Sequence, residues 1–218
     1  GLFQGMKDFN EDISSWDTSN VKSMSEMFSG CTCFNQPIGN WNTKNVTSMI
    51  SMFHDAKSFN QPIGNWDTNK LENISNMFEN AESFNQPIEN WDVSKISNMQ
   101  STFKGAINFN QSLSNWKIGK HRNPNMFSLF ENAKSFNGDV SNWKLSGYLT
   151  KFFYRAESFN QPLESWDVSE VRSFVFDNYA ISYILFNYSA DDPDQTSLDI
   201  FTKVNELEKA KEQILNVL

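Results

Sequence analysis

The sequence has little cysteine and histidine, and it has no long apolar run. Its 218 residues include two Cys and two His. Cys31 and Cys33 are two positions apart, which is too close for an ordinary structural disulfide, and no other Cys completes a zinc site. No apolar stretch approaches the roughly 20 residues of a membrane span. We therefore expect a fold that depends on neither disulfides nor bound metal.

Positive charge is also scarce. Lys and Arg total 18 against 26 Asp and Glu, which gives a formal net charge of −8. Nucleic acids and anionic membranes are bound through concentrated basic surfaces. The composition therefore disfavours both partners. The start at Gly1 does not resemble a signal peptide and falls inside a repeat, so we expect a fragment whose membrane anchor, if present, lies elsewhere.

Catalytic motifs are missing as well. No glycine-rich phosphate loop, no zinc-protease motif and no nucleophile elbow occurs. His54 and His121 are expected to lie on the order of 13 Å apart in a stacked repeat, too far to share a metal or a proton. The sequence predicts no enzyme, no catalytic residue, no metal and no cofactor.

What the chain does contain is a repeat of about 25 residues. The Phe-Asn pair begins at Phe9, Phe34, Phe59, Phe84, Phe109, Phe136 and Phe159. All tryptophans form a second column: Trp16, Trp41, Trp66, Trp91, Trp116, Trp143 and Trp166. A third column is apolar: Ile13, Ile38, Ile63, Ile88, Leu113, Val140 and Leu163. Seven copies in common register indicate tandem repeats.

One part of each copy has helical spacing. The apolar residues Val46, Met49, Met52, Phe53 and Ala56 lie on one face of a helix. Asp17, Asn42, Asp67 and Asp92 precede this part, where capping is a better explanation than calcium binding. It is followed by Gly30, Asp55, Asn80, Gly105 and Asn132, which tolerate a left-handed C-cap. We expect a helix of roughly ten residues per copy.

The rest of each copy is too short for a second helix. Prolines at Pro37, Pro62, Pro87 and Pro162 limit any strand to a brief one that begins at the following Ile or Leu. A short helix and a minimal parallel strand per coil predict an α/β solenoid of leucine-rich-repeat type. Strands stack more closely than helices, so we expect the stack to curve.

Two amide columns are candidates for different roles. The Asn column is predicted to be a hydrogen-bonded ladder between coils: Asn10, Asn35, Asn60, Asn85, Asn110, Asn137 and Asn160. The Gln column is either a second ladder or a concave polar binding face: Gln36, Gln61, Gln86, Gln111 and Gln161. The Trp column is either core or an exposed sugar-stacking platform, and its shared register with Phe and Ile favours the core.

The repeat slips once. Two residues are inserted between Trp116 and Trp143, and this stretch holds the densest positive charge of the chain. It supplies four candidate binding residues: Lys117, Lys120, His121 and Arg122. A tolerated loop insertion is the simpler interpretation.

The C-terminal part departs from the repeat. We expect seven coils over residues 1–178, a degenerate eighth coil and linker over 179–195, and a helix over 196–218. The helix is predicted to cap the last coil, because a terminal coil needs a cover. A dimeric coiled coil is the alternative.

The stretch Met52–Thr68 carries a resemblance to a known family. It resembles BspA-type leucine-rich-repeat surface proteins and, more narrowly, the mycoplasma-type surface-lipoprotein repeat, over about residues 1–178. Departures are Lys117 and Lys144 where Asp usually follows Trp, and Gly138 in place of Gln. The resemblance implies a cell-surface or secreted protein that contacts host or neighbouring-cell proteins, including extracellular matrix.

Three functions are therefore open. The chain is expected to be a binding or adhesion module that presents a repeat surface to a protein, through the concave face or the insertion near Lys117. The alternatives are a carbohydrate-binding module that uses the Trp, Asn and Gln columns, and a passive spacer. Oligomeric state, partner identity and anchoring mode are not specified by the sequence.

Overall fold

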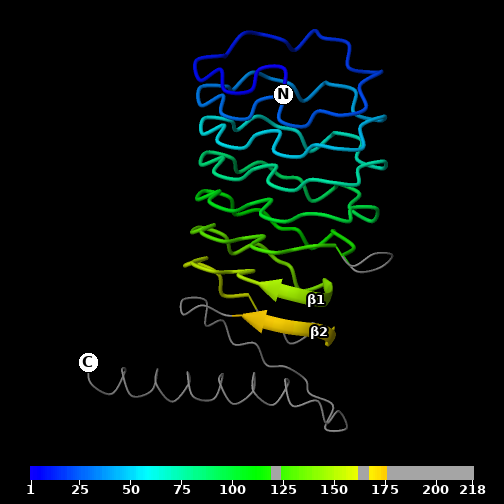
Figure 1. Ribbon diagram of the computed structural model, residues 1–218, viewed down its shortest axis with the longest axis vertical. Coiled ribbons are helices and arrows are strands. Elements are labelled where there is room, and N and C mark those ends of the chain that lie inside the picture. The colour runs from blue at the N-terminus through cyan, green and yellow to red at the C-terminus, as the bar shows by residue number, and fades with distance from the viewer. Residues whose placement is uncertain (119–123, 162–166, 176–218) are drawn as a thin grey trace, which may run out of the picture.

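The structure is a computed structural model that describes residues 1–118, 124–161 and 167–175. Figure 1 shows the chain winding in successive coils, each lying against the next, from the N-terminus down to strands β1 and β2. Isolated parallel bridges join equivalent positions of adjacent coils: Ser23 to Ser48, Ser48 to Asn73, Asn73 to Asn98, and Asn98 to Asn125. Residues one repeat apart in the sequence are therefore stacked neighbours in space.

Backbone hydrogen bonds hold each coil to the next one. In the third coil, every second N–H between Met49 and Asp55 donates to a carbonyl of the fourth coil. The pairs are Met49–Asn73 at 3.0 Å, and Ser51–Ser75, Phe53–Met77 and Asp55–Glu79 at 2.9 Å each. These N–H groups would point along the chain in a helix, but here they point across to the neighbouring coil.

The predicted ten-residue helices are wrong, since none of the described residues is helical. Each expected helix is a pair of tight turns, for example Met49–Met52 and Phe53–Ala56, closed by bonds from the fourth N–H to the first carbonyl. The third residues, Ser51 and Asp55, have φ of 51° and 56°, as in type II turns. The first and fourth residues of each turn are buried, so two consecutive turns place Met49, Met52, Phe53 and Ala56 inward, which imitates helical spacing.

The left-handed positions were foreseen in part. Asp55, Asn80 and Asn132 have positive φ, as does Gly30 at 75°, in the column that the sequence assigns to helix C-caps. A second left-handed column lies four residues earlier: Glu26, Ser51, Asn76, Ser101, Ser128 and Lys151. An α-helix cannot pass through these residues, because its backbone needs negative φ throughout.

The strands also lie elsewhere than expected. β1 (Lys144–Thr150) pairs in parallel with β2 (Asp167–Val175), and both strands begin directly after a tryptophan. Between each of Pro37, Pro62 and Pro87 and the tryptophan that follows it, no residue is in a strand, and the segment after Pro162 lies outside the described residues. There the chain turns again, with the Trp41 N–H donating to the Ile38 carbonyl at 3.1 Å, so few of its backbone groups are available for pairing.

Stacked aromatic rings fill the core. Phe53 contacts Phe59 of its own coil at 3.9 Å between ring centroids, and Phe28 and Phe78 of the neighbouring coils at 5.7 and 5.6 Å. The Phe column that contains Phe53 and the one that contains Phe59 are both fully buried in the inner coils. A single coil is too thin to bury these rings, so each coil depends on its neighbours.

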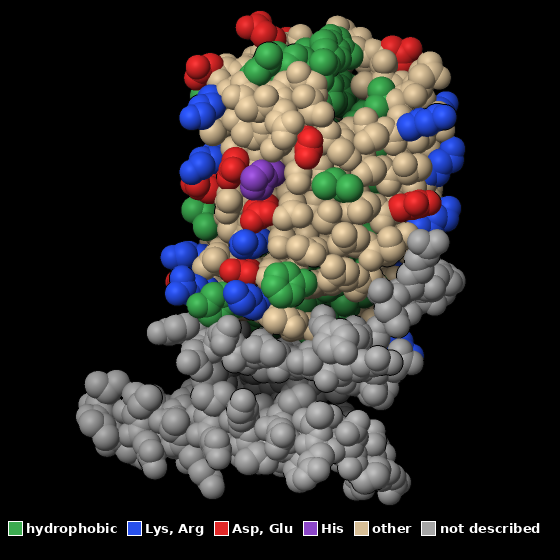
Figure 2. Space-filling model, in the orientation of Figure 1, with side chains coloured by type: hydrophobic (Ala, Val, Ile, Leu, Met, Phe, Trp, Pro, Cys, Tyr) green, Lys and Arg blue, Asp and Glu red, His purple; other side chains and the backbone are tan. Residues whose placement is uncertain are grey.

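The outer surface is mostly polar, with hydrophobic side chains gathered at the N-terminal end (Figure 2). The stack in Figure 1 shows little curvature in that view. The reason for expecting curvature, a difference in spacing between helices and strands, does not apply to the described coils, which have no helices. None of the described segments is a helix able to cross a membrane. The expected eighth coil (179–195) and C-terminal helix (196–218) lie outside the described residues.

Candidate functional site

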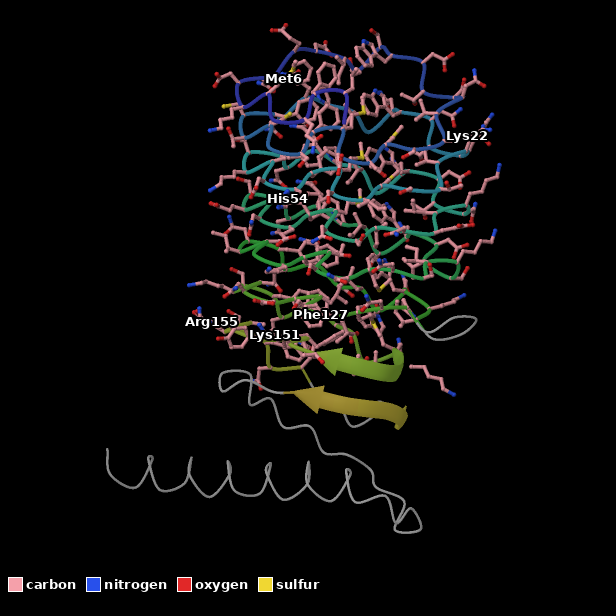
Figure 3. All side chains as sticks on the ribbon, viewed as in Figure 1. Met6, Lys22, His54, Phe127, Lys151 and Arg155 are labelled. Carbon is pink, nitrogen blue, oxygen red and sulfur yellow. The ribbon has the colours of Figure 1, made fainter. Side chains whose placement is uncertain are left out.

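The two turns of each coil form one side of the stack, which we call the turn face. The second residue of the second turn changes from coil to coil, and it is partly or fully exposed in every coil except the second, where Ser29 is buried. This variable row consists of Gln4, Ser29, His54, Glu79, Lys104, Glu131 and Tyr154. The turn imposes little side-chain preference at this position, so the row differs between coils that are otherwise alike. Figure 3 shows His54 on this side of the stack.

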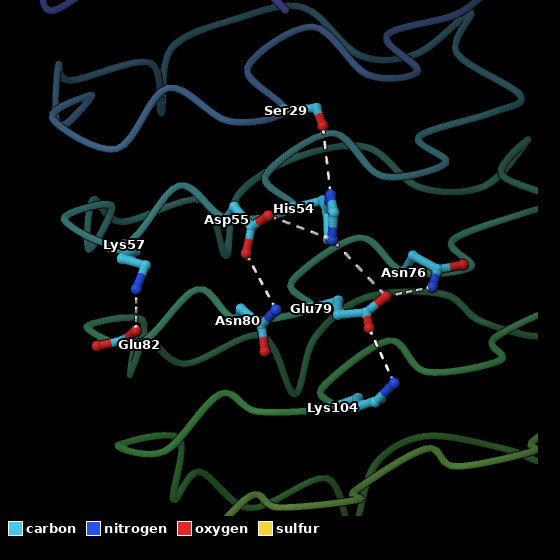
Figure 4. Close-up of polar contacts among 9 residues, drawn as sticks. All are labelled: Ser29, His54, Asp55, Lys57, Asn76, Glu79, Asn80, Glu82 and Lys104. Carbon is cyan, nitrogen blue, oxygen red and sulfur yellow. Dashed lines mark hydrogen bonds and ion pairs between the residues drawn. The ribbon is translucent and has the colours of Figure 1, made fainter. Parts of the chain in front are cut away.

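A network of polar contacts crosses four coils of the turn face around His54 (Figure 4). His54 Nδ1 lies 3.4 Å from the Ser29 hydroxyl, and Nε2 lies 3.5 Å from Asp55 and 4.0 Å from Glu79. Glu79 also accepts a hydrogen bond from Asn76 and forms an ion pair with Lys104 at 3.1 Å. The network ties the second to the fifth coil by side chains alone.

The order of Ser29, His54 and a carboxylate resembles a hydrolase relay, but it lacks the rest of such a site. Ser29 is only 8% exposed. Its own N–H donates to the Glu26 carbonyl, and the following Gly30 N–H donates to the His54 carbonyl. These amides are therefore unavailable to stabilise an oxyanion. The cluster acts as a structural network on the turn face.

The turn face ends in an aromatic and basic group, which we call the Tyr154 patch: Phe127, Lys151, Tyr154 and Arg155. The Arg155 guanidinium lies 5.0 Å and the Lys151 ammonium 5.6 Å from the centre of the Tyr154 ring. Phe127 is 39% exposed. The backbone bond from the Ser128 N–H to the Thr150 carbonyl brings the Phe127 segment against the Lys151 segment, and Figure 3 shows both residues at this end.

A second feature is an open pocket beside the insertion. Its volume is about 910 Å³, and its rim includes Glu89, Asp92, Lys117 and Lys144. Lys117 is therefore placed at a pocket, with Trp91 and Trp116 in the wall. The other three candidates from the insertion, Lys120, His121 and Arg122, lie outside the described residues. The mixed charges of the rim select no single ligand class.

The Asn column forms a continuous ladder in the structure. The side-chain oxygen of each Asn accepts the backbone N–H of the Asn in the next coil, at 2.8–3.0 Å, from Asn10 through to Asn160. The Gln side chains form a second ladder on the same edge. Their Nε2 groups donate to the preceding coil, for example from Gln61 to Asn35 at 3.0 Å and from Gln111 to Asn85 at 2.9 Å. These amide donors are engaged inside the stack.

The tryptophans belong to the core. Trp41, Trp66, Trp91, Trp116 and Trp143 are 1–4% exposed. Each of these indole N–H groups donates to a carbonyl of the preceding coil, for example from Trp66 to Ile38 at 3.2 Å. A sugar cannot stack on rings that are covered on both sides. The platform alternative is therefore wrong for these five residues.

The acidic column caps turns instead of helices. Asp17 and Asp92 each accept the N–H two residues on, at 2.9 Å. Backbone and side-chain hydrogen bonds from Ser19 lower the pKa of Asp17. Partial burial would raise the pKa of Asp92, but hydrogen bonds from Ser94 and the charges of Lys95 and Lys117 together outweigh it, and the net shift is downward. Among the described residues, no group of three or more His, Cys, Asp or Glu side chains is placed to hold a metal ion.

The stacked coils and shared ladders define a tandem-repeat protein. A family model described as "Mycoplasma protein of unknown function, DUF285" matches residues 1–116, 57–148 and 85–180. These overlapping matches span most of the chain, which therefore belongs to this repeat family. The comparisons with curated proteins and with solved structures gave no match.

The turn face is not among the sites expected from the sequence. The columns that are the same in every copy suggested sites, and in the structure they form ladders and core. The signal for the turn face is variation between copies, which is the opposite of repetition. A position that changes among coils, beside columns of Phe and Ala that stay nearly constant, is one where the stacking of the coils does not require a particular side chain.

Proposed function

We propose that the chain is a solenoid-type binding module of a cell-surface or secreted protein, and that its turn face contacts a protein partner. The observation that carries the proposal is the variable row on a scaffold whose Phe, Ile, Trp and Asn columns repeat. Binding specificity needs different side chains at defined places, and a rigid stack of turns supplies such places.

The Tyr154 patch is proposed as the centre of the contact. Tyr and Arg are enriched among the residues that dominate protein interfaces. Here the Arg155 guanidinium lies over the Tyr154 ring, which limits its motion before binding. The exposed Phe127 adds apolar area. The ion pairs farther along the face, such as Lys104 with Glu79, would then set orientation more than affinity.

The resemblance to BspA-type surface proteins supports a host or extracellular-matrix protein as the partner class. A carbohydrate ligand is less well supported, because the Trp column is buried and the Gln donors are engaged. A passive spacer would have no reason to concentrate aromatic and basic side chains at one end of one face.

A binding screen tests this proposal. The purified chain is passed over immobilised extracellular-matrix proteins and, in parallel, over a glycan array. We expect saturable binding to at least one protein and a loss of about tenfold or more for Tyr154→Ser or Arg155→Ser. The matched control is Lys22→Ser, since Lys22 is exposed and lies on another side of the stack (Figure 3).

Two results would contradict the proposal. Binding to glycans alone would favour the carbohydrate module. Binding to a protein that Lys22→Ser weakens as much as Tyr154→Ser does would show a contact elsewhere or a nonspecific one. Circular dichroism and unfolding midpoints of each variant establish that the stack is intact.

A further inference from the structure

The Tyr154 patch holds positive charge that no carboxylate of the described coils neutralises. Elsewhere on the turn face, Lys104 is paired with Glu79 at 3.1 Å. Within the described residues, neither Lys151 nor Arg155 forms an ion pair, and both lie against the Tyr154 ring instead. A chain with a net charge of −8 therefore gathers two uncompensated cations around one aromatic ring.

The backbone conformation of Arg155 indicates that the turn does not select an arginine. Arg155 has φ of 57°, in the left-handed region, and Lys151 has φ of 55°. In the earlier coils, the column of Arg155 contains only residue types that tolerate this conformation: Gly5, Gly30, Asp55, Asn80, Gly105 and Asn132. A long side chain is strained there. Strain of this kind clusters at binding sites, where the side chain has a use other than stability.

The side chains of the patch offer two kinds of contact at once. The Arg155 guanidinium can donate two parallel N–H bonds to one carboxylate, and the Lys151 ammonium adds a second positive charge. Phe127, which is 39% exposed, supplies apolar surface, and Figure 3 shows it at the same end of the stack as the two cations. A ligand that uses all three groups combines carboxylates with an apolar side chain over a short distance.

We propose that the Tyr154 patch binds an acidic segment of a partner polypeptide, with Asp or Glu carboxylates at Arg155 and Lys151 and an apolar side chain against Phe127. This inference rests on the proposed function, because it names the chemistry that the partner presents to the turn face. The charge of the chain gives such a segment few other places to bind, since acidic residues outnumber basic ones.

The rest of the turn face favours one position for the segment. Asp55 and Glu79 lie in earlier coils of the same face, and their carboxylates repel an acidic segment placed over them. The segment is thereby directed to the end of the face that holds the Tyr154 patch. A sulfated polysaccharide also carries negative charge, but it has no apolar side chain to cover Phe127, so the polypeptide is the better fit.

Fluorescence anisotropy with defined peptides tests the inference on the full chain. The probe is a labelled peptide in which Glu and Phe alternate with Ser. One comparison peptide has Gln in place of every Glu, and the other has Ser in place of every Phe. We expect the Glu-Phe peptide to bind about tenfold more tightly than either comparison peptide, and its binding to weaken as salt is raised.

Three variants separate a binding role of Arg155 from a structural one. Arg155→Asn should weaken peptide binding about tenfold while the unfolding midpoint stays the same or rises, because Asn tolerates the positive φ. Arg155→Lys keeps the charge but should still weaken binding several-fold, because an ammonium group cannot form the two parallel bonds. Lys22→Asn removes an exposed charge on another side of the stack and should bind like the original chain (Figure 3).

Several results would overturn the inference. It is wrong if the Gln peptide binds as well as the Glu peptide, or if Lys22→Asn weakens binding as much as Arg155→Asn does. It is also wrong if a heparin fragment binds at the patch and the acidic peptide does not. A matrix protein that binds through Tyr154, and that the acidic peptide fails to displace, would leave the turn-face function in place and remove the acidic segment as its ligand.

Discussion

The ladder edge and the turn face belong to the same coils, yet they differ in what changes along the stack. On the ladder edge, Asn85 accepts the N–H of Asn110 and also the Gln111 side chain, while its own N–H donates to Asn60. A change in one coil therefore disturbs the next. On the turn face the coils are joined by backbone bonds, such as that from the Ser51 N–H to the Ser75 carbonyl, so Glu131 and Tyr154 can occupy the same position in different coils. Repetition is required where one repeated side chain forms the bonds between coils, and variation is tolerated where the backbone forms them.

The largest effect should separate the core from the turn face. Phe78 is fully buried and stacks on Phe53, Phe84 and Phe103, whereas Phe127 is 39% exposed. We expect Phe78→Ala to lower the free energy of unfolding by about 3–5 kcal/mol, because it leaves a cavity among stacked rings. Phe127→Ala should change it by less than about 1 kcal/mol. Urea denaturation measures the free energy of unfolding of both variants. Equal losses in the two variants would contradict the distinction between the core and the turn face.

A smaller loss is expected on the ladder edge. Asn85→Ala removes the acceptor of two donors, so we expect a loss of about 1–3 kcal/mol by urea denaturation. Asn85→Asp is the matched control. A carboxylate oxygen accepts the same two bonds, and this variant should retain most of the stability. The ladder has no energetic role if both variants unfold like the original chain.

The next prediction concerns the left-handed residues of the turn face. Ser51 has φ of 51°, which only glycine adopts without strain. Ser51→Gly should therefore stabilise the chain by up to about 1 kcal/mol, and Ser51→Ala should not. A helix at this place would reverse the order, since Ala favours helices and Gly disfavours them. Thermal unfolding of the two variants decides between turns and helix.

That comparison also shows where sequence reasoning fails. The repeat, the inward-facing columns and the left-handed column at Asp55 can all be read from the sequence. The helix cannot be told from paired turns, because both place Val46, Met49, Met52, Phe53 and Ala56 inward. What decides between them is where the N–H groups bond, and that depends on the neighbouring coil. From Glu26 to Lys151, the second left-handed column has no glycine to reveal it.

The candidate site was harder to predict for a related reason. The Gln column appeared to be either a binding face or a ladder, and its donors are engaged with the preceding coil. The Tyr154 patch depends on which residues lie outward in a turn, and a helical model of the repeat places them differently. Comparing copies for variation would have indicated the row even without the correct local structure.

The two cysteines differ in burial, and this difference can be tested without a substitution that changes the stability of the chain. Cys31 takes the place of the buried Ala of the later coils, and burial raises the pKa of its thiol to about 11. At pH 8 roughly one Cys31 in a thousand is a thiolate, whereas Cys33 is exposed. We expect one thiol per chain to react rapidly with a disulfide reagent and the second only on unfolding. Two rapid thiols would contradict the burial of the column.

The most direct test of the account is hydrogen exchange at the indole N–H groups, followed by NMR with single Trp→Phe variants for assignment. The account predicts slow exchange for Trp41, Trp66, Trp91, Trp116 and Trp143, which donate to carbonyls of the preceding coil, and rapid exchange for Trp16. If the five inner indoles exchange as fast as Trp16, adjacent coils do not cover each other, and neither the ladders nor the turn face exist as described.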